Sequence, residues 1–180
     1  MPRFRTLVAL ALLLSGCAPQ PPARWAEGGA RIVIPTARLK LPDGDAIEIR
    51  ADGRVLEDGD VLFAIDRAGR VFTDEGDPIA VLGPDGLVEG PDATPLGRIG
   101  RSNAAPPGSA TAWLAVLPDG LVVHFAVDGE RTGLGAWEGC SGAALRTCTL
   151  VTHLILYQRA ARAAEARSGF GFGVGVGVYR

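Results

Sequence analysis

The sequence has few of the side chains that enzymes and metal sites depend on. Its 180 residues include only two histidines, His124 and His153, which we expect on a strand and on a helix. Neither belongs to an HExxH metal motif, and Ser141 lacks the Gly-x-Ser-x-Gly spacing of a nucleophile elbow. The sequence therefore predicts a protein that is not an enzyme and has no catalytic, cofactor-binding or metal-binding residues. A hydrolase that uses His124 and Ser141 is the one enzymatic alternative.

Positive charge is also scarce. The net charge is −2 at pH 7, and Lys40 is the only lysine. This balance argues against binding to nucleic acid and against electrostatic binding to anionic lipid, because both require an excess of basic side chains. The sequence also gives no indication of a small-molecule substrate.

The first sixteen residues have the pattern of a secretory signal peptide. Arg3 and Arg5 supply the positive beginning, and residues 7–14 form an apolar run of the expected length. This run is too short to cross a bilayer as a mature helix, which needs about 20 apolar residues. We therefore expect residues 1–16 to be removed on export.

The tetrapeptide Leu14-Ser15-Gly16-Cys17 ends this segment and resembles the lipobox of bacterial lipoproteins. In that family, signal peptidase II cuts before the cysteine, which carries a diacylglyceryl group on its thiol and usually an acyl chain on its amine. The resemblance implies lipidation of Cys17, and two or three acyl chains hold a protein stably on a membrane. Ala18 follows, rather than the Asp that marks inner-membrane retention in enteric bacteria, so the outer membrane is favoured over the inner.

The stretch 17–30 is rich in Pro, Ala and Gly, and we interpret it as a lipidated, partly extended tether. Trp25 lies within it and either packs on the folded domain, which we favour, or sits at the lipid headgroups. The following residues, 31–139, form the predicted β-domain. Residues 140–180 are expected to pack on the same domain.

An internal repeat predicts the architecture of that domain. Apolar segments lead into Asp-Gly or Ala-Gly turns at Gly53, Gly69, Gly86 and Gly120, which are separated by 16, 17 and 34 residues. Since 34 is twice 17, a degenerate unit is expected in between, with Asn103 in the glycine position. Each unit of about 17 residues is predicted to hold two short strands and two tight turns. The fold class is therefore mainly β, an antiparallel meander of hairpin repeats.

Alternation along the strands predicts which side chains face the core. The expected core residues are Ile47, Ile49, Val55, Val61, Phe63, Ile65, Val71, Ile79, Val81, Val88, Val122, Phe125 and Val127. The longest predicted strand runs from Leu121 to Val127. A calcium site at the repeated Asp residues is the alternative to a purely structural turn, but the spacing does not match the glycine-rich calcium-binding nonapeptide.

The last third of the chain combines a cysteine pair with a helix. Cys140 and Cys148 are even in number in an exported protein, so we expect them to form a disulfide, rather than a reactive or metal-binding thiol pair. From about Thr147, apolar residues recur at helical spacing, and the helix is expected to be buried in its first half and solvated from Gln158 to Arg167. Ser168-Gly169 ends it.

Glycine alternates with Phe or Val in residues 169–180. As a strand, this segment would have only glycine on one face. It either completes the sheet of the domain as a final glycine-rich strand, forms a flexible tail, or is an interaction or membrane-inserting strand that needs partners.

These observations predict a membrane-anchored lipoprotein of the cell envelope that acts as a non-enzymatic binding or structural module. Its expected partners are the membrane, through the lipid, and an unidentified envelope protein. The alternative is a component of an oligomeric surface or membrane assembly built through residues 169–180.

Overall fold

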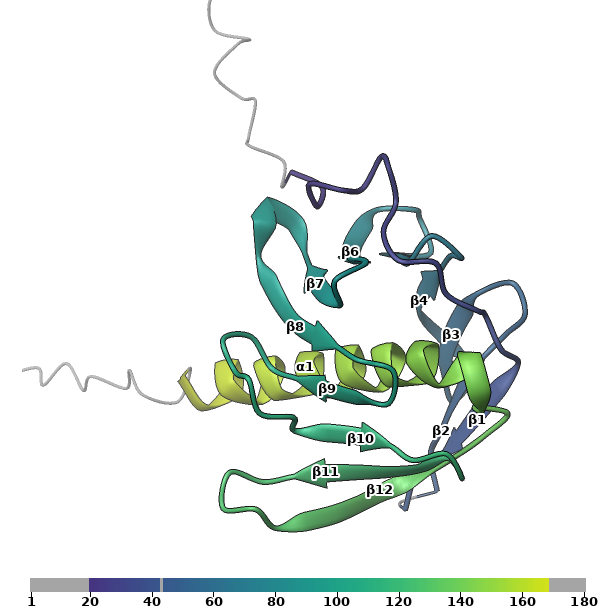
Figure 1. Ribbon diagram of the computed structural model, residues 1–180, viewed down its shortest axis with the longest axis vertical. Coiled ribbons are helices and arrows are strands. Elements are labelled where there is room, and N and C mark those ends of the chain that lie inside the picture. Colours follow the sequence, from purple (N-terminus) through teal and green to yellow (C-terminus); the bar gives the residue numbers. More distant parts are fainter. Residues whose placement is uncertain (1–19, 43, 169–180) are drawn as a thin grey trace, which may run out of the picture.

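The computed structural model describes residues 20–42 and 44–168, which form a closed antiparallel β-barrel around one helix (Figure 1). Cys17 and residues 169–180 lie outside the described residues. The fold class is confirmed as a mainly β antiparallel meander with one C-terminal helix. The strands are β1 (Ala37–Lys40), β2 (Ala46–Ile49), β3 (Arg54–Glu57), β4 (Asp60–Ile65), β5 (Arg70–Phe72), β6 (Pro78–Leu82), β7 (Leu87–Glu89), β8 (Pro95–Ile99), β9 (Asn103–Ala105), β10 (Leu114–Val116), β11 (Leu121–Phe125) and β12 (Arg131–Glu138). Two short 3₁₀ helices (Pro91–Ala93 and Gly142–Ala144) and the helix α1 (Leu145–Ser168) complete the described chain.

One type of turn connects most of the strands. In residues 50–54, the Gly53 amide donates to the Arg50 carbonyl and the Arg50 amide donates to the Arg54 carbonyl, both at 2.9 Å. Gly53 has a φ of +91°, which favours glycine, so this is a type I turn followed by a glycine bulge. The same hydrogen bonds recur at residues 66–70, 73–77, 83–87, 117–121 and 126–130. The glycines therefore recur in the sequence because each of these turns requires a residue with positive φ.

Successive turns lie at opposite ends of the barrel. We call the end with the turns after β2, β4, β6, β8 and β10 the entry end, because α1 enters the barrel there; the other is the exit end. At the entry end, a turn carbonyl accepts a hydrogen bond from a strand of the next hairpin. Gly53, Gly69, Gly86, Ser102 and Gly120 accept in this way from Ile65, Leu82, Ile99, Val116 and Trp137. Each hairpin is thereby fastened to its neighbour.

The prediction for the degenerate repeat was wrong in one residue. We expected Asn103 in the glycine position with left-handed backbone, but Asn103 is the first residue of β9 and is not among the described residues with positive φ. Ser102 occupies the equivalent position, since its carbonyl accepts the bond from Val116. The turn between β8 and β9 is one residue shorter than the others, so it needs no bulge.

Pairing between the first and last strands closes the barrel. β1 pairs with β12 through Arg38–Glu138, Leu39–Trp137 and Lys40–Ala136. Because every described strand has two neighbours, the barrel has no free edge for a further strand to join. The sequence did not predict β12, and β11 ends at Phe125. Val127 was wrongly placed in the core: it lies in the 126–130 turn and is fully exposed.

Helix α1 fills the interior of the barrel (Figure 1). Every residue from Thr147 to Ile155 is buried, which a helix achieves only when it is surrounded on all sides. Its polar side chains there are satisfied: Thr147 donates to the Val33 carbonyl (2.6 Å), and Trp137 of β12 donates to Thr152 (2.9 Å). The predicted helix is confirmed and begins two residues earlier, at Leu145. Residues 159–167 are exposed, as predicted.

Strand side chains pack against α1 from around the barrel. Of the predicted core residues, Ile47, Ile49, Val55, Phe63, Ile65, Val71, Val81, Val88 and Val122 are buried, and Val61, Ile79 and Phe125 are half-buried. Val81 is buried for a different reason from the rest. Its neighbours Ala80 and Leu82 belong to the interior cluster, so Val81 points outward, where the N-terminal segment covers it at Gly29.

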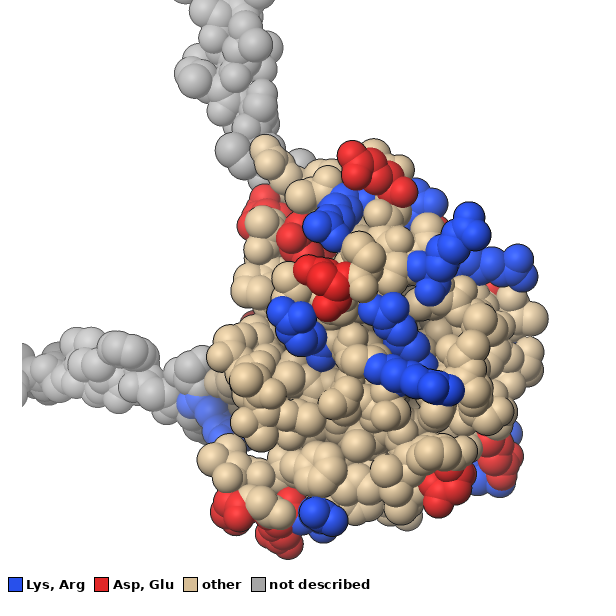
Figure 2. Space-filling model, viewed as in Figure 1, with Lys and Arg blue, Asp and Glu red and all other residues tan. Residues whose placement is uncertain are grey.

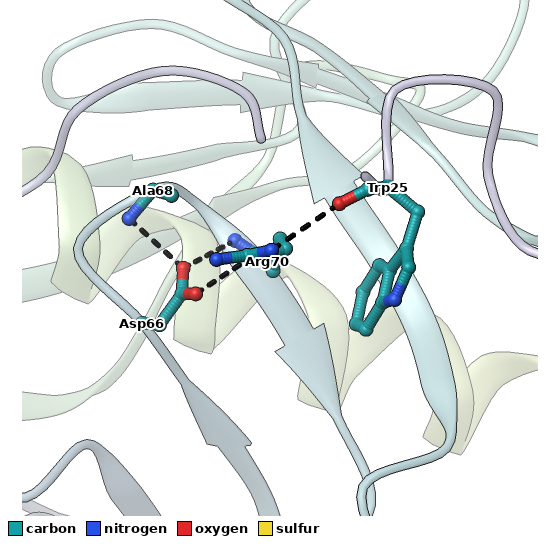
Figure 3. A network of polar contacts seen from close by, with 4 residues as sticks. All are labelled: Trp25, Asp66, Ala68 and Arg70. Atoms are coloured by element: carbon teal, nitrogen blue, oxygen red, sulfur yellow. Dashed lines mark hydrogen bonds and ion pairs between the residues drawn. The ribbon is translucent and has the colours of Figure 1, made fainter. Parts of the chain in front are cut away.

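The N-terminal segment 20–36 runs along the outer wall from the exit end to the entry end. Gln20 and Asp92 exchange two hydrogen bonds at the exit end, each 2.9 Å. Midway, the Trp25 ring meets Phe72 edge-on, with 6.4 Å between ring centroids, which confirms that Trp25 packs on the domain. Figure 3 shows how Arg70 fastens this segment: it is ion-paired with Asp66 (2.8 Å) and donates to the Trp25 carbonyl (3.4 Å).

Candidate functional site

The predicted disulfide is confirmed. Cys140 and Cys148 are bonded, and both are buried. The bond joins the chain just after β12 to the second turn of α1, so it fixes the helix where it enters the barrel. The other predicted site residue, Cys17, lies outside the described residues.

His153 forms a buried polar network in the middle of α1. Its Nδ1 accepts a hydrogen bond from Trp113 Nε1 (3.0 Å), and its Nε2 lies 2.8 Å from the Leu96 carbonyl. Since an indole N–H only donates and a carbonyl only accepts, the ring is neutral with its proton on Nε2. Tyr157 stacks on the ring, with 6.1 Å between centroids. A Cβ at Gly97 would come within 2.6 Å of Nε2, so the ring requires glycine there.

This environment predicts loss of stability in mild acid. Burial lowers the pKa of His153, and the hydrogen bond to the Leu96 carbonyl opposes this only partly. In the unfolded chain, the pKa of His153 is near its ordinary value of about 6.5. Below that pH, the unfolded chain therefore binds more protons than the folded chain. The free energy of unfolding should fall as the pH drops below about 6.5, by at most about 1.4 kcal/mol per pH unit for this one group. Urea unfolding between pH 7.5 and 5.5 measures the slope. A His153→Gln variant with the same slope would contradict the assignment.

The structure does not bring His124 and Ser141 together. His124 lies in β11 opposite Thr132, with its ring 5.9 Å from that of Trp113. Ser141 follows the other end of β12 and is exposed at the entry end. The six residue-to-residue steps of strand from Thr132 to Glu138 span about 20 Å. The geometry that the hydrolase alternative requires is therefore not present in this fold.

A small apolar crevice lies where α1 leaves the barrel. Its volume is about 160 Å³, close to that of cavities known to hold benzene. The lining residues are Leu39, Leu41, Pro42, Ile47, Leu134, Thr152, Ile155, Leu156 and Arg159. Arg159 also pairs with Glu57 of β3, which ties the helix to the exit end. The crevice offers space for one small apolar group.

The turns at the two ends of the barrel differ in charge. Every charged side chain in the described part of the exit-end turns is acidic: Asp45, Asp58, Asp74, Glu75, Asp77, Asp92, Asp128 and Glu130. At the entry end, arginines border three successive turns and the start of α1. The entry-end turns themselves carry both signs, with Asp52, Asp66, Asp85 and Asp119 among the arginines.

We call the entry-end group the arginine arc; it comprises Arg31, Arg67, Arg98, Arg101 and Arg146. Hydrogen bonds show that its members are neighbours. The Ile32 amide donates to the Arg67 carbonyl, Arg146 donates to the Gly83 carbonyl, and Arg98 donates to the Asp85 carbonyl. The Thr149 hydroxyl of α1 reaches the Arg101 carbonyl. In Figure 2, basic side chains lie at the centre and upper right of the face in view, with acidic side chains beside and above them.

None of the five arc guanidiniums is ion-paired with a carboxylate among the described residues. Four of them are exposed, and Arg146 is half-buried. Of the acidic residues in the same turns, Asp66 is ion-paired with Arg70, and Asp85 forms no ion pair with an arc guanidinium. The sequence did not reveal this group, since the average charge of the chain is slightly negative.

The fold and these sites define the protein as a twelve-stranded antiparallel barrel filled by its own C-terminal helix, with acidic turns at the exit end and an arginine arc at the entry end. No family model, curated protein or solved structure matches the chain. Within the described residues, no helix is both long and apolar enough to cross a membrane.

Proposed function

We propose that this protein is a lipoprotein of the bacterial cell envelope, anchored through Cys17, and that its barrel is a non-enzymatic binding or structural module. The outer membrane is the favoured location. The observation that carries the module role is the filled interior: residues 147–155 of α1 are buried, so the barrel has no open lumen. A partner is therefore met on the outer surface, chiefly at the charged ends.

The position of the N-terminal segment supports an anchor at the exit end. Gln20, held by Asp92, is only three residues after Cys17, which limits the separation of these two residues to about 10 Å. A lipid on Cys17 would place the exit end toward the membrane and the entry end away from it. An assembly built through residues 169–180 remains the second candidate; because the barrel is closed, such a strand would have to pair outside it.

Replacing Cys17 with serine tests the anchor. Cells that express the full chain are fed an alkyne-bearing palmitate, and the protein is followed by in-gel fluorescence and by fractionation. We expect Cys17→Ser to abolish the label and to move the protein out of the membrane pellet, because its apolar attachment is lost.

The matched control is the double substitution Cys140→Ser and Cys148→Ser, which removes thiols but leaves residues 14–17 intact. This variant should keep the label and its place in the membrane fraction. A Cys17→Ser protein that stays labelled or equally membrane-bound would refute the proposal.

A further inference from the structure

We propose that the arginine arc is a docking surface for an acidic cell-wall polymer, the carboxylate-bearing stem peptides of peptidoglycan. This inference rests on the proposed envelope location for the identity of the partner. The binding surface itself rests on the positions of the arginines.

The turns present the arc as a row. The 66–70, 83–87 and 100–103 turns follow one another around the entry end, each two strands from the next. Since neighbouring strands are about 4.8 Å apart, successive turns are about 10 Å apart. Arg146 projects from the first turn of α1 to the Gly83 carbonyl, in the middle of the row. An extended partner can therefore meet several guanidiniums at once.

The chemistry of the arc favours carboxylates. Guanidinium groups bind carboxylates through two parallel hydrogen bonds, and they are less strongly hydrated than lysine ammonium groups. The guanidiniums of Arg31, Arg67 and Arg101 form no hydrogen bond or ion pair with another described residue, so their donors can bind a partner. Asp85 is the only acidic side chain of the 83–87 turn, and the arc is net positive. Several weak pairs formed with one polymer add up to useful affinity.

The arc lies at the end of the barrel opposite the proposed anchor, on the side away from the membrane. The N-terminal segment carries the chain from the exit end, at Gln20, to the entry end, at Ile32 beside Arg67. Most of the described strands hold three to five residues, which gives the wall a length of about 10–17 Å along the strands. With Cys17 anchored at the exit end, the arc lies at the opposite end of this wall.

Cosedimentation of the detergent-purified full chain with isolated peptidoglycan sacculi tests the proposal. The test variant combines Arg67→Gln and Arg101→Gln, and we expect it to bind about tenfold more weakly, which corresponds to about 1.4 kcal/mol. The control combines Arg131→Gln and Arg162→Gln, which removes the same charge from exposed positions outside the arc. It should bind within about twofold of the unmodified chain. Sacculi whose carboxylates have been amidated should not bind.

Three results would overturn the inference: equal binding by the test variant, equal binding to amidated sacculi, or binding to phosphatidylglycerol vesicles in place of sacculi. The palmitate label is read on the same preparations. If the unmodified chain takes up the label but does not bind sacculi, the docking surface alone is rejected. If the unmodified chain binds sacculi but takes up no label, the anchor alone is rejected.

Discussion

Replacing Gly120 with alanine should lower the free energy of unfolding by about 3–5 kcal/mol, or prevent folding altogether. A Cβ at this position would overlap the carbonyl oxygen of Trp137, which belongs to the backbone of β12. That backbone cannot retreat easily, because the Trp137 amide donates to the Gly120 carbonyl (2.8 Å) and β12 is paired on both sides. The left-handed φ of +91° adds about 1–2 kcal/mol to the cost of the overlap.

Gly129 provides the matched control at the other end of the same strand. Its φ of +87° is nearly that of Gly120, but a Cβ there would meet no atom within 4 Å. Gly129→Ala should therefore cost only the backbone strain, about 1–2 kcal/mol. Urea unfolding followed by tryptophan fluorescence compares the two variants. Equal losses would show that the entry-end turns are not packed as described.

The difference between these two glycines extends to the turns as a class. At the entry end, a Cβ on Gly53, Gly86 or Gly120 would collide with a carbonyl of the next hairpin, whereas Gly59, Gly76 and Gly129 at the exit end have open space. The period of about 17 residues in the sequence thus records one complete hairpin, from one packed turn to the next. This is why the strands, the turns and most of the core could be predicted from spacing alone.

Closure of the barrel could not be predicted in this way. It depends on pairing between β1 and β12, which are separated by almost the whole domain, and no local signal reports such a contact. β12 itself contains Gly133 and Gly135 and lacks simple alternation, and a shift in register interrupts its pairing with β11. Val127 followed the alternation of β11, but the 126–130 turn begins before it. In each case, tertiary pairing overrode the local pattern.

The distribution of charge over the barrel could not be predicted for a different reason. Net charge and charge runs average along the chain, whereas a meander sends alternate turns to opposite ends of the barrel. Asp74, Glu75 and Asp77 therefore gather at one end, and Arg67 and Arg101 at the other, although they are interleaved in the sequence. Sorting the turns by odd and even position would have isolated the acidic exit-end turns but not the arginine arc, because the entry-end turns also carry Asp52, Asp66, Asp85 and Asp119. Arg31, Arg98 and Arg146 come from the N-terminal segment, β8 and α1, so their place in the arc requires the three-dimensional structure.

The second large effect is expected inside the barrel, where Leu150→Ala should lower the free energy of unfolding by about 3–5 kcal/mol. Leu150 lies on α1 with no exposed surface, among side chains contributed by surrounding strands. Truncation of a buried leucine costs the transfer of its methyl groups and the cavity left behind, and the cost is highest where neighbours cannot move inward. A closed ladder of twelve paired strands resists such collapse, because each strand is fixed by two others.

Leu121→Ala removes the same atoms from a position that is 39% exposed, on the outer side of β11. It should cost less than about 1 kcal/mol, since little apolar surface is returned to water. Chemical unfolding of both variants measures the two losses in the free energy of unfolding. If Leu150→Ala costs no more than Leu121→Ala, α1 does not fill the barrel as a packed core. A large difference means instead that the helix and the barrel fold as one cooperative unit around a solid interior.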